Sequence, residues 1–83
     1  MSIYDTRMIQ LIKILQTLGT ITYQFEFADS LGMHKQALTQ IKTGKGGFTP
    51  AQILTACKLW KVNANWIFGI EKEVFIKNVY PNV

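Results

Sequence analysis

The sequence has few of the residues on which disulfide-bonded, metal-binding or membrane-spanning proteins depend. Its 83 residues include a single cysteine, Cys57, and one cysteine can form neither an internal disulfide nor a metal cluster. No stretch approaches the roughly 18 consecutive apolar residues that a membrane span needs. Because Cys57 lies in an apolar run, we expect its thiol to be packed in the interior.

Residues that support catalysis are also sparse. His34 and Cys57 are each the only residue of their type, and most of the five acids lie outside the middle of the chain. No convergent set of nucleophile, base and metal ligands is visible, so we predict no enzyme activity, no metal site and no cofactor. The first residues lack the basic and apolar regions of an export signal, so we expect no membrane partner and a cytoplasmic location.

Negative charge is missing from the middle of the chain. Residues 30–70 contain five lysines and neither Asp nor Glu, in a chain of net charge +4. These lysines are Lys35, Lys42, Lys45, Lys58 and Lys61. Such a segment suits docking of an acidic polymer, but it is equally typical of a solvated surface with no partner. Charge alone does not choose between the two.

The apolar pattern indicates one all-α domain. With 48% apolar residues and no low-complexity tract, the chain is long enough for a single core. Helical spacing predicts helices over residues 3–18, from 22 or 23 to 30, 34–42 and 50–61, with a short one through 66–68. Glycines end several of these segments, and Thr49 with Pro50 forms a good helix start.

The predicted core includes aromatic residues of the carboxyl-terminal half. In the helix over 50–61 we expect an inward stripe of Ile53, Leu54 and Cys57, continued by Trp60 or Lys61. We likewise assign Trp60, Trp66 and Phe68 to packing. Residues 71–83 are rich in β-formers, which favours a strand, but Ile70, Val74 and Val79 also fit a helical stripe. Both alternatives, strand and helix, remain open for residues 71–83.

Residues 23–42 have the pattern of two short helices that cross at a tight turn. Ala28 supplies a small side chain for the close crossing, and Gly32, four residues later, permits positive φ in the turn. Met33, Leu38 and Ile41 would anchor the second helix to the core. Helical spacing then leaves an acid-free polar face of Lys35, Gln36, Thr39, Gln40 and Thr43.

On these residues the chain resembles the phage-repressor-like helix-turn-helix family, that of the XRE, Cro and lambda-repressor-like DNA-binding domains. The resemblance is carried by Gln24, Phe27, Ala28, Leu31, Gly32, Met33, Leu38, Ile41, Gly44 and Lys45. Residues 7–13 are similar to the family's first helix, and residues 62–69 to its closing helix. The resemblance implies a compact five-helix domain over residues 1–70, with 71–83 as a carboxyl-terminal arm and dimerisation segment.

The same resemblance implies sequence-specific binding of double-stranded DNA by a small transcriptional regulator, usually a repressor. The recognition helix, about 34–42, would enter the major groove and place Lys35, Gln36, Thr39 and Gln40 at base edges. Backbone contacts are expected from Gln24, His34, Lys42, Thr43, Lys45 and Gly46. Two positions depart from the family pattern. His34 replaces the usual cap and either meets phosphate or faces solvent, and Tyr23 replaces a threonine, which suggests an earlier helix start.

The expected partners are DNA and a second copy of the chain. One recognition helix contacts few base pairs, so we expect a homodimer that joins through the closing helix and the arm. The alternative is an antitoxin-like or antirepressor-like module. In this module the helix-turn-helix is a scaffold, and the apolar arm binds a regulatory protein partner.

Overall fold

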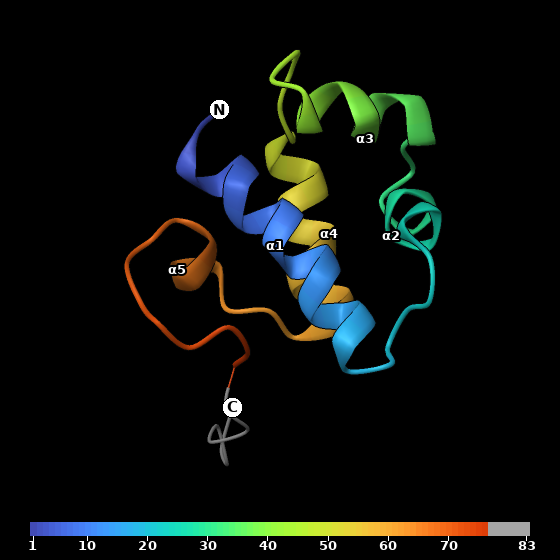
Figure 1. Cartoon of the computed structure of the whole chain (residues 1–83). Coiled ribbons are helices and arrows are strands. Elements are labelled where there is room, and N and C mark those ends of the chain that lie inside the picture. Colours follow the sequence, from blue (N-terminus) through green and yellow to red (C-terminus); the bar gives the residue numbers. More distant parts are fainter. Residues whose placement is uncertain (77–83) are drawn as a thin grey trace.

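A computed structural model describes residues 1–76 and contains five α-helices in this range. They are α1 (Ile3–Thr17), α2 (Gln24–Ser30), α3 (Lys35–Lys42), α4 (Pro50–Trp60) and α5 (Ala64–Ile67). Figure 1 shows α1 and α4 at the centre of the view, with α2 and α3 toward one side and α5 toward the other. Within the described residues there is no named strand, so the prediction of a compact helical domain is confirmed.

Local capping sets the ends of the two longest helices. The Ser2 hydroxyl accepts a hydrogen bond from the Asp5 amide at 3.4 Å, and α1 ends one residue earlier than predicted. At the start of α4, Thr49 Oγ1 accepts from the Gln52 amide at 3.1 Å, while Gln52 Oε1 accepts from the Thr49 amide at 2.8 Å. This reciprocal pair is a capping box, and Pro50 takes the first helical position as expected.

Helix α2 begins at Gln24, so the earlier start suggested by the sequence is wrong. A tyrosine hydroxyl lies too far from its own backbone to cap like a threonine. The Glu26 carboxylate stabilises this end of the helix through different amides, accepting from the Tyr23 amide at 2.7 Å and also from the Thr22 amide. A negative charge in the first turn is favourable because unpaired amides point toward it.

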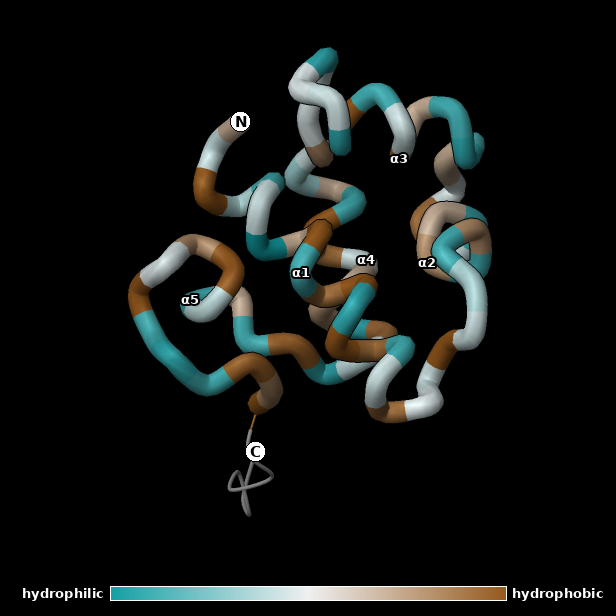
Figure 2. The backbone as a smooth tube through the Cα atoms, viewed as in Figure 1, coloured by the Kyte–Doolittle hydropathy of each residue, from teal (hydrophilic) through white to brown (hydrophobic). Residues whose placement is uncertain are grey.

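The core is centred on Phe27, which is fully buried. Its ring stacks on Trp60 at 5.2 Å between centroids and meets the edge of Phe48 at 6.3 Å. These contacts attach α2 to α4 and to the loop that follows α3. Met8, Leu11, Ile12 and Leu15 of α1 belong to the same cluster, and Figure 2 shows apolar and polar residues alternating along α1 and α4.

Two predicted core positions are wrong. Leu54 is 54% exposed and Phe68 is 47% exposed. Helix α4 instead buries Ile53 and Ala56, so its inward stripe is rotated away from Leu54. Phe68 follows α5 and packs at the surface against the Tyr4 ring, with centroids 5.7 Å apart. The expectation for Trp66 is confirmed: it is buried, with the Arg7 guanidinium 5.1 Å from its ring centroid.

The described part of the arm is extended rather than helical. The Asn63 amide donates to the Val74 carbonyl and the Ile76 amide to the Lys61 carbonyl, both at 2.8 Å. Val62 and Phe75 thereby form an isolated antiparallel bridge. The helical alternative is therefore wrong for Val74, and its proposed continuation to Val79 lies outside the described residues.

Replacing Phe27 by alanine should destabilise the domain by about 3–5 kcal/mol, because it leaves a cavity where the α2, α4 and loop contacts meet. Urea unfolding followed by circular dichroism measures this change. Phe25→Ala is the matched control on the same helix: its ring is 54% exposed, and its loss should change stability by less than about 0.5 kcal/mol. Equal effects of the two substitutions would contradict the assignment of Phe27 as the core residue.

Candidate nucleic-acid interface

Helices α2 and α3 are joined by a tight turn with a fixed geometry. Gly32 has φ +70°, in the left-handed region that favours glycine. The Met33 amide donates to the Ala28 carbonyl at 2.9 Å, which brings the chain back across the end of α2. Ala28 is 1% exposed, so the small residue expected at the crossing is indeed buried. The turn therefore sets the angle at which α3 leaves the body.

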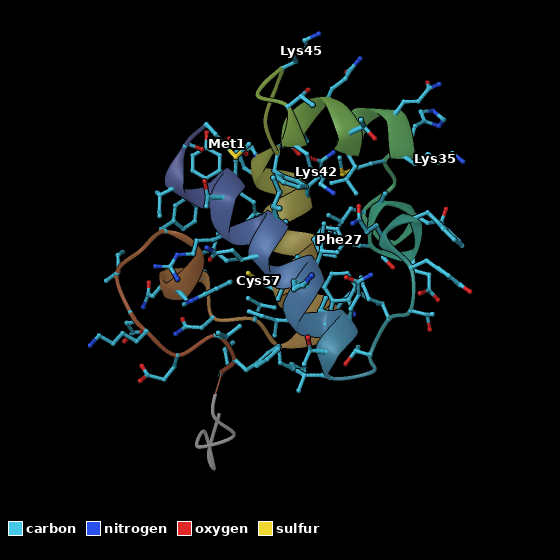
Figure 3. The ribbon with its side chains drawn as sticks, in the orientation of Figure 1. Met1, Phe27, Lys35, Lys42, Lys45 and Cys57 are labelled. Atoms are coloured by element: carbon cyan, nitrogen blue, oxygen red, sulfur yellow. The ribbon has the colours of Figure 1, made fainter. Side chains whose placement is uncertain are left out.

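Helix α3 has one buried side and one exposed side. Leu38 and Ile41 are buried, and Met33 is half-buried against the core. All ten predicted contact residues are exposed: Gln24, His34, Lys35, Gln36, Thr39, Gln40, Lys42, Thr43, Lys45 and Gly46. Figure 3 shows Lys35 and Lys45 pointing away from the body of the domain at the two ends of this region. The outer side of α3 is thus a continuous polar surface with no acid of its own.

Gln24 and Lys42, both expected at the DNA backbone, lie together. Lys42 Nζ donates to Gln24 Oε1 at 2.9 Å, so this bond links the start of α2 to the last turn of α3. Lys13 of α1 lines the same shallow hollow as these two residues. Sequence reasoning missed Lys13, because nothing in the pattern of an amphipathic helix signals that its polar side adjoins another helix pair.

The hydroxyl protons of Thr39 in α3 and of Thr43, its C-cap, are already bonded to carbonyl groups of the helix. Thr39 Oγ1 donates to the Lys35 carbonyl at 3.1 Å and Thr43 Oγ1 to the Gln40 carbonyl at 2.9 Å. These threonines therefore offer a ligand their methyl groups and their oxygen lone pairs. His34 is the N-cap of α3 and makes no side-chain capping bond. Both alternatives for His34, phosphate contact and solvent exposure, are compatible with this geometry.

The loop after α3 presents backbone amides beside Lys45. The Lys45 amide donates to the Gln40 carbonyl at 2.8 Å, which fixes the loop against the helix end. Within residues 1–76, no hydrogen bond occupies the amides of Gly46 and Gly47. Free amides next to a lysine are suited to bind an anionic oxygen.

A buried carboxylate holds this loop in place. Asp5 is 5% exposed and accepts hydrogen bonds from the Phe48 amide at 2.8 Å and the Ser2 hydroxyl at 2.7 Å. A Cβ at Gly47 would lie 3.0 Å from Asp5 Oδ2, so a larger residue there would require the carboxylate to shift by a few tenths of an ångström. The sequence analysis missed this contact, because Asp5 and Phe48 are 43 residues apart and no local pattern links them.

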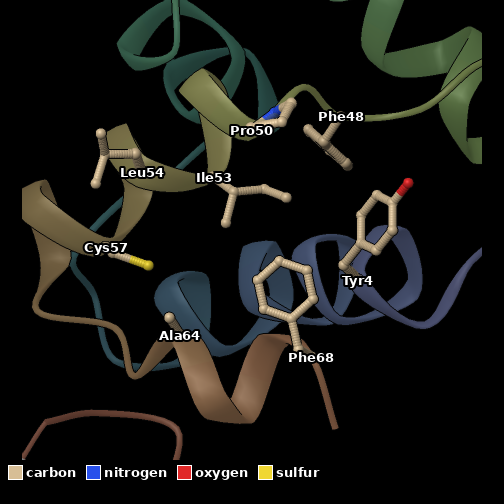
Figure 4. Close-up of a pocket in the computed structure, with 8 residues that line it drawn as sticks. All are labelled: Tyr4, Phe48, Pro50, Ile53, Leu54, Cys57, Ala64 and Phe68. Carbon is tan, nitrogen blue, oxygen red and sulfur yellow. The ribbon is translucent and has the colours of Figure 1, made fainter.

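A second candidate surface is the apolar groove between α1, α4 and α5, with a volume of about 450 Å³. Its lining, shown in Figure 4, consists of Tyr4, Phe48, Pro50, Ile53, Leu54, Cys57, Ala64 and Phe68. Burial raises the pKa of the Cys57 thiol, which keeps it in the neutral form.

The turn after α5 is held by polar contacts. The Asn63 and Asn65 side-chain amides donate to Glu71 Oε1 at 2.8 and 3.1 Å. These bonds favour the charged carboxylate and lower the pKa of Glu71. The contacts fix the path of the chain from α5 to the extended residues 74–76.

Other kinds of site find no support in the described part of the chain. Residues 1–76 bring together no group of three potential metal ligands among His, Cys, Asp and Glu. Among the same residues, no helix has the length and apolar character needed to cross a bilayer. No family model, curated protein or solved structure matches the sequence or its fold.

Asp5→Ala should destabilise the domain by about 1–3 kcal/mol, because the buried Phe48 amide loses its acceptor. Amide hydrogen exchange should also become faster at Phe48. Asp5→Asn is the matched control, since an amide oxygen can still accept from Phe48, and it should retain most of the stability and slow exchange. Unchanged exchange at Phe48 in Asp5→Ala would show that the carboxylate does not hold the loop.

Proposed function

We propose that the chain binds double-stranded DNA sequence-specifically, as a small transcriptional regulator of the lambda-repressor-like helix-turn-helix class. One observation carries the proposal: a short helix is anchored by Leu38 and Ile41, and its opposite side exposes only polar and basic groups. An α-helix of this kind fits the major groove of B-DNA. Repression is the expected regulatory outcome.

The exposed side chains of α3 have the chemistry that base edges require. Gln36 and Gln40 can each bond N6 and N7 of adenine, and Lys35 can donate to O6 and N7 of guanine. The Thr39 methyl group suits thymine. Since the Thr39 hydroxyl proton is held by the Lys35 carbonyl, this residue would discriminate mainly through its methyl group.

The residues around α3 supply charge and hydrogen-bond donors for the phosphates. Lys45 and the Gly46 amide lie at one end of the face, and His34 lies at the other. Lys42, Thr43 and Gln24 complete the proposed backbone contacts, and Thr43 would release its hydroxyl proton from the Gln40 carbonyl in order to donate to a phosphate. Lys42 is already held by Gln24, so this pair would meet the duplex as one preorganised unit. Phosphate contacts of this kind fix register but carry no sequence information.

Selection of bound duplexes from a random pool tests this proposal. The wild-type chain should enrich a short sequence. Gln36→Ala should relax the preference at one position, at a cost of about 1–3 kcal/mol against the wrong base. Lys45→Ala should weaken binding to all sequences. It should also reduce the slope of log affinity against log salt concentration by about 1. Lys58→Ala, which removes the same charge outside α2, α3 and their loop, is the control and should do neither. Failure to enrich any sequence would refute the proposal.

We further propose that two copies bind together, with the apolar groove of α1, α4 and α5 at the interface. Leu54 and Phe68 are exposed beside this groove, and apolar surface of this kind is favourable to bury. The resulting twofold symmetry would require an inverted repeat in the DNA, with half-site centres about 34 Å apart or a multiple of this distance.

Sedimentation of the chain with the selected duplex should show two copies per site. Leu54→Glu should reduce this to one copy, because it places an unpaired charge in the contact. Leu59→Glu is the matched control: Leu59 is 53% exposed on the same helix but does not line the groove. A single wild-type copy on DNA would overturn the dimer.

The same groove favours the alternative of a protein-binding module. In that case α3 would be a scaffold element, and the groove would hold an apolar segment of a regulatory protein. This function predicts that the affinity for DNA does not depend on the DNA sequence. It also predicts a specific protein complex that Leu54→Glu disrupts. Sequence selection and copurification therefore separate the two proposals.

A further inference from the structure

Two exposed aromatic rings lie beside the proposed recognition helix, and neither belongs to the hydrophobic core. Tyr23 is 60% exposed and Phe25 is 54% exposed. Their rings stack almost in parallel, with centroids 5.4 Å apart and an interplanar angle of 9°. Leaving such rings in water forgoes the stabilisation that burial would give. The pair therefore forms a preordered apolar surface at the start of α2.

Phe25 lies between two hollows that adjoin α3. The first has a volume of about 430 Å³ and is lined by Tyr23, Gln24, Phe25, Lys35, Gln36, Leu38 and Thr39. The second contains Phe25 with Asp29, Met33, His34 and Lys35. The Phe25 ring thus shares a hollow with three of the four residues proposed to read bases. A ligand that reaches Lys35 and Gln36 from outside also comes close to Phe25.

The chemistry of the first hollow selects an apolar group on an otherwise polar ligand. Its lining combines two aromatic residues with Gln36 and Lys35, whose side chains end in an amide and an ammonium group. The major-groove edge of a base pair that contains thymine offers this combination: a 5-methyl group next to hydrogen-bonding atoms. A phosphate suits the Phe25 surface less well, because the ring donates no hydrogen bond and the Asp29 carboxylate lines the adjoining hollow.

We propose that Phe25, supported by Tyr23, is a specificity residue that contacts the 5-methyl group of a thymine at the edge of the site read by α3. This inference rests on the proposed DNA binding. It adds a reading position contributed by α2, outside the recognition helix. Stacking against Tyr23 favours one orientation of the Phe25 ring, which lowers the entropy cost of its contact with the methyl group.

The test replaces each thymine of the selected duplex, one at a time, by deoxyuridine, which lacks only the 5-methyl group. The affinities of the wild-type chain, Phe25→Ala and Phe25→Leu are measured by fluorescence anisotropy on every duplex. At one thymine the wild-type chain should lose about fourfold in affinity, the value expected for one buried methyl group. Phe25→Ala should bind the two duplexes equally, and Phe25→Leu should retain part of the discrimination.

Thr39→Ser controls for the other methyl-bearing residue in the hollow. If every thymine effect survives in Phe25→Ala, the inference is overturned, and loss of the effect in Thr39→Ser would then assign the methyl group to Thr39. It is also overturned if no thymine methyl group affects wild-type binding. These results leave sequence-selective binding intact, whereas the absence of any selected sequence refutes the proposed function itself. Circular dichroism confirms that each variant is folded.

Discussion

The aromatic contact between Phe27, Trp60 and Phe48 is the interaction on which the remaining structure depends. Phe27 comes from α2, Trp60 from the last turn of α4, and Phe48 from the loop after α3. Segments that are remote in sequence are therefore positioned by one buried ring. Helix α3 is only eight residues long, and a helix of that length is marginal by itself in water. Its place is set by Leu38, Ile41 and the turn at Gly32, all of which rely on α2 being held by Phe27.

A second constraint is the buried carboxylate of Asp5. Burial of a charged group is costly unless hydrogen bonds compensate it, and Asp5 has two partners, Ser2 and Phe48. One of them caps α1 and the other lies at the end of the loop that carries Lys45 and Gly46. The amino terminus of α1 thus determines where these proposed phosphate contacts stand. The close approach of Gly47 follows from the same carboxylate.

The two candidate surfaces differ in their chemistry and suggest different partners. The outer side of α3 is polar and basic, whereas the groove of α1, α4 and α5 is apolar. In the proposed regulator, the first surface would meet DNA and the second another copy of the chain. The Tyr23 and Phe25 rings are an exception, because they place apolar surface on the side of the molecule assigned to DNA. The proposed thymine contact would cover this apolar surface.

The sequence by itself determined that the five helices exist and how α4 begins. Helical periodicity, Gly32, and the pair of Thr49 and Pro50 are local signals, and residues close in sequence interact strongly enough to fix them. It also placed the exposed polar face of α3, since Leu38 and Ile41 define the opposite side. Only the tertiary structure decided the burial of Asp5 against Phe48, the exposure of Leu54 and Phe68, and the pairing of residues 74–76 with residues 61–63. These features depend on contacts between distant segments and on small rotations of each helix, which a periodic pattern does not specify.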